Sequence, residues 1–447
     1  MWVKIEVIPS DHETIYLPAC LQAKYKNLCS VTFGHLSVNA EVKYANDLEA
    51  QEGSTYERPV KIRLTDILRE KLQIPDVLVY QCKISEPNIL LGPVIGFLLG
   101  IHTHRYNAAH MTKYSDRFGI YNKVGGLIYA FSPKSINWKN NTAYGLYYNI
   151  SKTQWEYGHF PLPEVIYRRD FHSSPKLIKE LIKLTNGRLF NSYRYTKIEL
   201  YNIVRRDPKL CKYLPPTETS RDHYQLKRFI NNFGKVILKP IDLSRGRGIC
   251  IIEKKDTGYR VIDYRHKSAI VSEYNDMEAF DDFLSVNRGL FCKYLIQKYL
   301  PLARIDKSPF DIRVVMHKGK DKTWGCTGIE CRVSNGNSHI TNISRGGYAL
   351  SLGDALRKAF PTNCDYNKLS QQIHDFCIAF CQCMDNTHEH YAELGMDVAV
   401  DVNQNLWLIE ANVFPSFKGF KKMDYETYLS IRYKPLLYAL SLTEFGV

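Results

Sequence analysis

The stretch DVAVDVNQNLWLIEANVFPSF, residues 397–417, decides the fold of this chain. Its alternating valines predict one strand, the polar NQN predicts a turn, and LWLIEAN predicts the returning strand. If Asn403 and Gln404 form a two-residue loop, Asp397 lies opposite Glu410 in the hairpin. A carboxylate among apolar strand residues is costly unless a partner compensates its charge, so this hairpin needs an explanation.

The polar face of the predicted hairpin supports two interpretations. On the second strand, Glu410 shares one face with Leu408 and Asn412. Asp397, Glu410 and Asn412 then bring two carboxylates and an amide oxygen to one side, and Mg²⁺ accepts oxygen ligands of this kind. Alternatively, this face meets water while Val398 and its neighbours pack inward. The hairpin alone leaves both interpretations open.

The bulk composition is that of a folded protein. The chain has 447 residues, 45% hydrophobic and 24% charged, which predicts two or three domains. The longest apolar run, residues 89–101, is too short for a membrane span, and residues 1–13 lack the apolar centre of a signal peptide. The 12 cysteines are scattered, as reduced thiols are, so we expect a cytoplasmic protein. The net charge of +14 favours anionic partners such as a nucleotide, an acidic substrate or RNA.

The sequence pattern divides the chain into three regions. Residues 1–90 read as short strands with one amphipathic helix in LTDILREKLQI, which predicts a β-rich amino-terminal domain. Residues 91–190 predict an α/β domain, with a buried strand in GPVIGFLLG and a helix in SSPKLIKELIKL that begins near Pro175. From 191 to 447 helices and strands alternate, which predicts a larger domain of mixed type.

A second stretch, FGKVILKPIDLSRGRGICII at 233–252, predicts a strand, a loop and another strand. Lys239 ends the first strand, and the loop from Ser244 to Gly248 has exposed amides and little side-chain bulk. Backbone N–H groups and a lysine in this arrangement can hold phosphate oxygens. The same residues also fit a plain hairpin turn with an edge lysine, or a short arginine–glycine contact to RNA.

Other segments carry weaker signals. PFDIRVVMHKG predicts a strand with Asp311 and Arg313 on one face, and Arg345 lies beside two glycines in NISRGGYA. A segment rich in cysteine and histidine invites a zinc hypothesis, but its cysteines follow one apolar helical stripe, which predicts packing in the core. The residues in question are Cys377, Cys381, Cys383, His388 and His390. The histidines at 102, 104 and 110 lack ligand spacing and are expected in a loop.

Taken in order, these stretches resemble the ATP-grasp superfamily, and most closely its YheC/YheD branch of endospore coat-associated proteins. RLTDILREKLQIPD, ILLGPVIGFLLG and FPLPEVIYRRDF resemble the amino-terminal half of that branch. The rest is similar to the ligase core shared with glutathione synthetase and the ribosomal-protein glutamate ligase. The resemblance implies an α+β ATP-grasp domain at 191–447 with a lid subdomain at about 220–295. A pre-ATP-grasp α/β domain at 91–190 and the β-rich region at 1–90 would precede it.

The resemblance also implies roles for individual residues. Lys197 and Lys239 would bind phosphate, and Arg313 and Arg345 would contact the transferred phosphoryl group or the acyl phosphate. The implied magnesium ligands are Asp397, Glu410 and Asn412. The residues implied for the lid loop, the adenine hinge and one further phosphate or metal contact are Ser244, Arg245, Gly246, Arg247, Gly248, Gln297, Lys298, Tyr299, Leu300 and Asn342.

One departure from the family pattern concerns the ribose of ATP. The hinge of this family often carries, or is soon followed by, an acid that binds ribose. Here the hinge reads Gln297-Lys298-Tyr299 and the nearest later acid is Asp306. The ribose contact therefore has no assigned residue.

The function that the resemblance implies is amide formation by a carboxylate–amine ligase, through an acyl phosphate and with ATP and Mg²⁺. The expected substrate is an acidic small molecule or peptide, no membrane partner is expected, and the resemblance adds the spore coat as a location. Two alternatives stay open: a non-catalytic coat or scaffold protein that keeps the nucleotide site, and an RNA-binding protein that uses its basic surface. The cost of burying three polar residues argues against the first, and the lack of an aromatic-rich RNA motif argues against the second.

Overall fold

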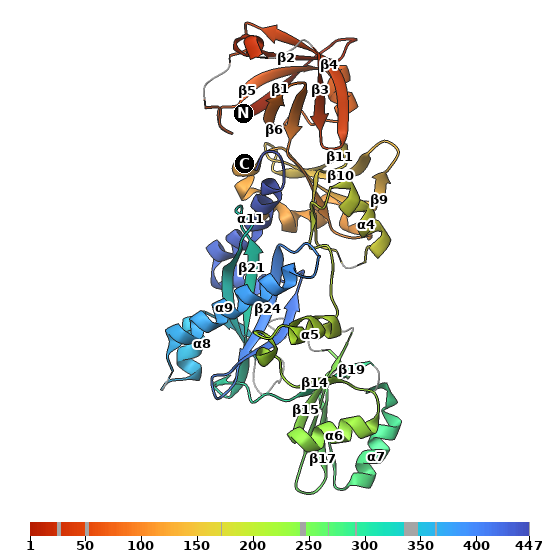
Figure 1. Cartoon of the computed structure of the whole chain (residues 1–447), viewed down its shortest axis with the longest axis vertical. Coiled ribbons are helices and arrows are strands. Elements are labelled where there is room, and N and C mark those ends of the chain that lie inside the picture. The colour runs from red at the N-terminus through yellow and green to blue at the C-terminus, as the bar shows by residue number, and fades with distance from the viewer. Residues whose placement is uncertain are drawn as a thin grey trace.

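The computed structural model describes residues 1–24, 28–49, 53–170, 172–241, 247–266, 268–290, 293–334, 347–362 and 364–446. These residues form a closed barrel and three six-stranded sheets. Figure 1 shows them spread along the long axis of the molecule, with the amino-terminal barrel at one end and the sheet of residues 217–298 at the other. In the described ranges, no helix is both long enough and apolar enough to cross a membrane.

The barrel is built from strands that alternate between inside and outside. In the first strand Val3 and Ile5 are buried and Lys4 is exposed. The amphipathic helix predicted for this region is confirmed as α1 (Asp66–Leu72), which buries Leu68 and Leu72. The order around the barrel is β1 (Trp2–Ile8), β5 (Val60–Thr65), β2 (Thr14–Pro18), β4 (Leu36–Ala45), β3 (Leu28–Phe33), β7 (Asn88–Gly92) and β6 (Val79–Ser85), and the 3₁₀ helix η1 (Ala19–Lys24) follows β2.

The second sheet has parallel strands at its centre and shares one hydrophobic core with the barrel. Its order is β11 (Gln154–Pro161), β10 (Thr142–Asn149), β9 (Leu127–Asn137), β8 (Val94–Leu98), β12 (Val165–Arg168) and β13 (Leu189–Phe190). All five residues of β8 are buried, as predicted. The predicted helix is α4 (Pro175–Leu184), which Ser174 caps by accepting a hydrogen bond from the Leu177 amide. The other helices are η2 (Thr103–Arg105), α2 (Ala108–Met111), η3 (Thr112–Ile120) and α3 (Tyr121–Val124).

The third sheet is antiparallel, and helices cover one of its faces. Its order is β14 (Thr217–Thr219), β19 (Tyr294–Lys298), β15 (Lys235–Pro240), β16 (Cys250–Lys254), β17 (Tyr259–Asp263) and β18 (Ile270–Tyr274). Val236 and Leu238 share a core with α6 (His223–Phe233) and α7 (Met277–Val286). Because strand side chains alternate, Lys239 and Gln297 point to the opposite face. Helix α5 (Lys197–Arg206) and the 3₁₀ helices η4 (Cys211–Tyr213) and η5 (Arg288–Leu290) complete this part.

The fourth sheet lies between two layers of helix. Its order is β23 (Tyr348–Leu350), β22 (Trp324–Val333), β21 (Ser308–Lys318), β24 (Glu393–Val400) and β25 (Leu406–Asn412), and β20 (Arg304–Ile305) pairs with β21. Ile312 and Met316 on β21 share a core with α8 (Leu352–Ala359) and α9 (Tyr366–Asp385). Val315 instead packs with α10 (Lys418–Met423) and α11 (Tyr425–Ser441). Asp311 and Arg313 share the face of Val315, so this second face carries the polar groups of the strand.

The helical stripe predicted from the cysteine-rich segment is confirmed in α9. Its buried residues are Leu369, Ile373, Phe376, Cys377, Phe380, Cys381 and Met384. The two buried cysteines therefore act as small apolar core residues. Among the described residues, no three histidine, cysteine or acidic side chains group as ligands for a metal ion.

Candidate functional site

The predicted metal-binding hairpin is formed by strands β24 and β25. Asp397 pairs with Glu410, which confirms the predicted register at this point. The turn differs from the prediction, because the Asp401 backbone amide donates to the Asn405 carbonyl and the loop between them has three residues instead of two. Gln404 in this loop has a φ of 64°, and the Asp401 carboxylate accepts a hydrogen bond from the Asn405 amide at 2.9 Å. Three-residue loops that end in the left-handed conformation are a common hairpin type.

A β-bulge in β25 restores the register that the longer loop shifts. Val398 pairs with Leu408 and Asp397 pairs with Glu410, so Ile409 is the extra residue. The prediction that Leu408 shares a face with Glu410 is wrong, since Leu408 is buried in the core that contains Val398. The longer loop shifts the pairing by one residue, which would turn each side chain of β25 to the other face of the sheet. The bulge adds one residue and reverses this change for the residues that follow it. The bulge is what brings Glu410 to the face of Asp397.

Two arginines hold Asp397. Arg313 on β21 donates from Nη2 to Oδ2 at 3.0 Å and from Nε to Oδ1. Arg332 on β22 lies 3.1 Å from Oδ2 of Asp397 and donates to both oxygens of Asp311 at 2.6 and 2.7 Å. Burial alone would raise the pKa of Asp397, but the two arginines outweigh it and lower that pKa. Asp397 is therefore a buried carboxylate that remains charged.

Glu410 has the opposite balance. Burial raises its pKa, and the negative charge of Asp397 raises it further. The positive charges of Lys197, Lys239 and Arg313 act against this increase without cancelling it. Two neighbouring carboxylates that repel each other in this way would be stabilised by a cation bound between them.

The two lysines predicted to bind phosphate converge from different elements. Lys239, near the end of β15, donates from Nζ to Oε1 of Gln297 at 2.7 Å. Lys197, the first residue of α5, donates from Nζ to the carbonyl of Pro240 at 3.0 Å. Burial lowers the pKa of Lys239 to about 8, with Glu410 acting against this change and Lys197 adding to it. An anion bound between these lysines would offset the cost of their charges.

The start of α5 is fixed by local sequence. The Thr196 side chain accepts a hydrogen bond from the Glu199 amide, and the Glu199 side chain accepts one from the Thr196 amide. This reciprocal capping box ends the preceding extended segment and begins the helix at Lys197. The lysine therefore stands at a helix amino terminus, where the backbone dipole also favours an anion.

The hinge predicted at residues 297–300 divides between the two faces of the third sheet. Gln297 lies on the face of Lys239 and contacts it. The Lys298 ammonium lies 5.7 Å from the ring centroid of Phe233, on the face that α6 covers. The structure thus brings the Gln297 side chain to the site and turns the Lys298 side chain away from it.

Five predicted residues lie outside the described ranges. They are Ser244, Arg245 and Gly246 of the lid loop, together with Asn342 and Arg345. Of the remaining lid-loop residues, Arg247 is exposed and Gly248 has a φ of 71°. A positive φ is accessible to glycine without strain, as the tight entry into β16 requires.

Sequence reasoning missed Glu330 and Arg332, which lie on one face of β22. Glu330 pairs with Arg313 and Arg332 pairs with Asp311 across the two strands. Glu330 is 2% exposed, burial raises its pKa to about 7, and in the described structure its Oε2 has no hydrogen-bond partner. The alternation Glu-x-Arg in GIECRV was the available signal, since it matches the Asp-x-Arg of the neighbouring strand.

The donor set fits a divalent cation and a polyphosphate. Asp397 and Glu410 present carboxylates from paired positions, and Asn412 follows two residues beyond Glu410 opposite Gly395. These three oxygen donors leave ligand positions for phosphate oxygens and water, which is the usual coordination of Mg²⁺. The lysines and Arg313 supply positive charge beside the carboxylates, so the arrangement can hold the phosphates of a nucleotide.

The fold and this site together define a protein of the ATP-grasp class with the α+β architecture predicted from the sequence. A family model described as YheC/D-like ATP-grasp matches residues 186–442, which is more than half of the chain. The chain therefore belongs to the YheC/D-like ATP-grasp family, as the sequence resemblance implied.

Two curated relatives come from Bacillus subtilis (strain 168). Endospore coat-associated protein YheD is 25% identical over 92% of this chain and 89% of its own length. Endospore coat-associated protein YheC is 20% identical over 74% of this chain and 91% of its own length. Among solved structures, the ATP-grasp ligase PsnB complexed with precursor peptide PsnA2 and AMPPNP is 13% identical, with a TM-score of 0.43, over 78% of this chain and 97% of that one. A superposition as loose as this gives no correspondence between individual residues.

Proposed function

We propose that this protein is a carboxylate–amine ligase that uses ATP and Mg²⁺ and acts through an acyl phosphate. The convergence of Lys197, Lys239 and Arg313 on the carboxylate pair of Asp397 and Glu410 carries the proposal. Membership of an ATP-grasp family supports the nucleotide. The bulge in β25 supports a role for Glu410 beyond the fold, because the core of the hairpin would be satisfied without a buried carboxylate.

The proposed reaction has two steps. In the first, an oxygen of the substrate carboxylate attacks the γ-phosphorus of ATP, the bond from that phosphorus to the β,γ-bridging oxygen breaks, and ADP leaves. In the second, the nitrogen of an amine attacks the acyl carbon, the carbon–oxygen bond to phosphate breaks, and the nitrogen loses a proton to solvent. The products are an amide, ADP and phosphate.

The chain's own residues would bind and orient the reactants. Lys197 and Lys239 would hold the phosphates, and Arg313 would stabilise the oxygens of the phosphoryl group in transfer. Asp397, Glu410 and Asn412 would hold Mg²⁺, which supplies charge neutralisation of the phosphates when bound. The buried carboxylate of Glu330 lies within the same face and would orient Arg313, its cross-strand neighbour.

The remaining sequence assignments are part of the same proposal. The lid loop would contribute Ser244, Arg245, Gly246, Arg247 and Gly248, and residues 297–300 would form the adenine hinge. Asn342 and Arg345 would contact phosphate, metal or the acyl phosphate. The division into domains 1–90, 91–190 and 191–447, with a lid at about 220–295, is supported by the limits of the sheets at Gly92, Phe190 and Lys298.

Location and substrate class complete the proposal. The two Bacillus subtilis relatives are named as endospore coat-associated proteins, and we extend an association with the spore coat to this chain. The net charge of +14 supports an acidic small molecule or peptide as substrate.

The test is a screen of amino acids and peptides for phosphate release from ATP in the presence of Mg²⁺. Hydroxylamine added to the reaction should convert an acyl phosphate into a hydroxamate, which mass spectrometry detects. Lys239→Met should abolish release, while Lys254→Met, an exposed lysine on β16, should leave it unchanged. Nucleotide binding without phosphate release for any substrate would favour the scaffold alternative, and the absence of nucleotide binding would refute the site itself.

A further inference from the structure

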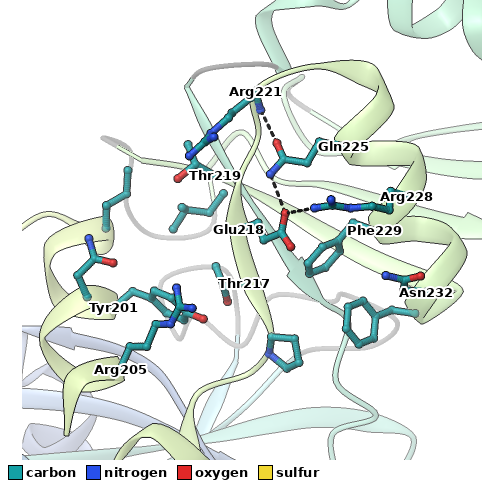
Figure 2. A pocket seen from close by; sticks show the side chains of 15 residues that line it. Tyr201, Arg205, Thr217, Glu218, Thr219, Arg221, Gln225, Arg228, Phe229 and Asn232 are labelled. Carbon is teal, nitrogen blue, oxygen red and sulfur yellow. Dashed lines mark hydrogen bonds and ion pairs between the residues drawn. The ribbon is translucent and has the colours of Figure 1, made fainter.

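A pocket of about 720 Å³ lies beside the edge strand of the third sheet, between helices α5 and α6 (Figure 2). Helix α5 contributes residues from Ile198 to Arg205, and α6 contributes residues from Gln225 to Phe233. None of the lining residues belongs to the proposed nucleotide or metal site. The volume falls in the range of ligand-binding pockets, and we refer to this feature as the β14 pocket.

Strand β14, which crosses this pocket, has an edge that no strand of the described structure pairs with. On its inner side, the Ser220 amide donates to the Tyr294 carbonyl at 2.8 Å, just beyond the strand. Antiparallel pairing alternates, so the N–H and C=O groups of Thr217 and Thr219 point outward. Outward groups of this kind are a template for one more strand.

The charge of the β14 pocket is positive. Among the described residues that line it are three arginines, Arg205, Arg221 and Arg228, and one carboxylate, Glu218, so these four have a net charge of +2. That carboxylate already accepts hydrogen bonds from Arg228 at 2.9 Å and from Gln225 at 2.7 Å. Figure 2 shows both contacts on the α6 side of β14, whereas Arg205 approaches from α5 on the other side.

We propose that the β14 pocket docks an acidic, extended segment of a partner polypeptide, which adds to β14 as a strand. The backbone of the segment would pair with Thr217 and Thr219. Its side chains would alternate between the two sides of β14, so acidic residues at every second position would meet Arg205 on one side, and the residues between them would lie on the α6 side, where Arg228 already pairs with Glu218. An RNA strand would match the charge, but its backbone does not repeat the N–H and C=O groups that pair with a strand edge at strand spacing. This docking does not depend on the ligase reaction, because the pocket shares no residue with that site.

The test is fluorescence anisotropy of a labelled peptide, Glu-Val-Glu-Val-Glu-Val-Glu-Val, titrated with the full chain in low salt without nucleotide. We expect saturable binding that Arg205→Glu weakens at least about tenfold, since it replaces a charge-assisted hydrogen bond with repulsion. Thr219→Pro should weaken binding about as much, because it removes an outward N–H group, and proline is tolerated on an edge strand. Arg206→Glu is the matched control: it is exposed on the same helix turn but does not line the pocket, so binding should not change.

Several results would overturn the proposal. One is no binding of the peptide at millimolar protein, and another is an equal loss of affinity in Arg206→Glu and Arg205→Glu. Equal binding of a Lys-Val peptide would also overturn it. Tighter binding of octauridylate would assign the surface to nucleic acid. Thermal melting establishes that each variant is folded. If Thr219→Pro does not fold, strand pairing is tested from the side of the peptide instead. A peptide methylated at alternate backbone nitrogens is then titrated with the wild-type chain. Weaker binding of that peptide supports strand pairing, and equal binding overturns it.

Discussion

Raising the pH from 7 to 9 should weaken ATP binding about tenfold through Lys239 alone. Burial lowers the pKa of this lysine to about 8. The fraction of molecules with a charged Lys239 therefore falls from about nine in ten at pH 7 to about one in ten at pH 9. A lysine at its ordinary value of 10.5 would stay charged over this range, and no loss would follow. The neutral amine cannot attract phosphate, so affinity should follow the charged fraction.

Isothermal titration of Mg²⁺ and ATP into the protein at pH 7, 8 and 9 measures this effect. Lys239→Arg keeps the charge at every pH, because the guanidinium titrates above pH 12. The affinity of Lys239→Arg for ATP should therefore be nearly constant from pH 7 to 9. Any change in it measures the titration of ATP itself and is subtracted from the wild-type result. An equal decrease in wild type and Lys239→Arg would refute the reasoning, and so would a wild-type affinity that is unchanged at pH 9.

Three further perturbations test the site and its support. Glu410→Gln should fold normally and lose most of the rise in melting temperature that ATP with Mg²⁺ produces, because it removes one anionic ligand and keeps the shape. Glu393 is fully buried and accepts hydrogen bonds from Arg169 at 2.6 and 2.7 Å. Burial by itself would raise the pKa of Glu393, but its positively charged surroundings, Arg169 first among them, outweigh burial and lower that pKa from 4.5 to about 2. Glu393→Gln should therefore destabilise the protein by about 3 kcal/mol at pH 7 in urea unfolding, and the difference should shrink as the pH falls below about 4.5. Gly395→Ala should cost about 1–3 kcal/mol and weaken ATP binding, because its Cβ would collide with the Pro415 side chain and lie close to Arg313, on the face of Asp397.

Each of these expectations has a contradicting outcome. An unchanged response to nucleotide in folded Glu410→Gln would remove the metal assignment. A Glu393→Gln protein as stable as wild type at pH 7, or a difference that grows in acid, would show that the buried pair does not stabilise the fold. A Gly395→Ala protein with wild-type melting and wild-type ATP affinity would show that the hairpin can shift without consequence.

The local parts of the fold could be predicted because they follow from short-range periodicity. The stripe in α9 places Cys377 and Cys381 at helical spacing with aromatic and aliphatic neighbours, and this spacing favoured core packing over metal binding without any tertiary information. The capped start of α4 at Pro175 and the buried strand β8 are local in the same sense. The sequence also suggested that Asp397 and Glu410 meet, since a hairpin brings residues together across a short loop.

The candidate site as a whole required the tertiary structure. Arg332 and Asp397 are 65 positions apart, and they meet only because β21 lies between β22 and β24 in the fourth sheet. Amino-acid composition does not distinguish a hairpin loop of three residues from a loop of two. Without the bulge at Ile409, the three-residue loop would have placed Glu410 on the face opposite to Asp397.

The sequence by itself thus determined which residues carry charge and which strands and helices they belong to, because propensity and periodicity act over a few residues. Only the tertiary structure decided that Lys197 from α5 and Lys239 from β15 approach the same carboxylate, Glu410. The edge of β14 that no described strand pairs with, and the arginines around it, also emerged only there. The physical reason is that sheet order and helix packing are fixed by burial of apolar surface summed over the whole domain, and a local pattern does not contain that sum.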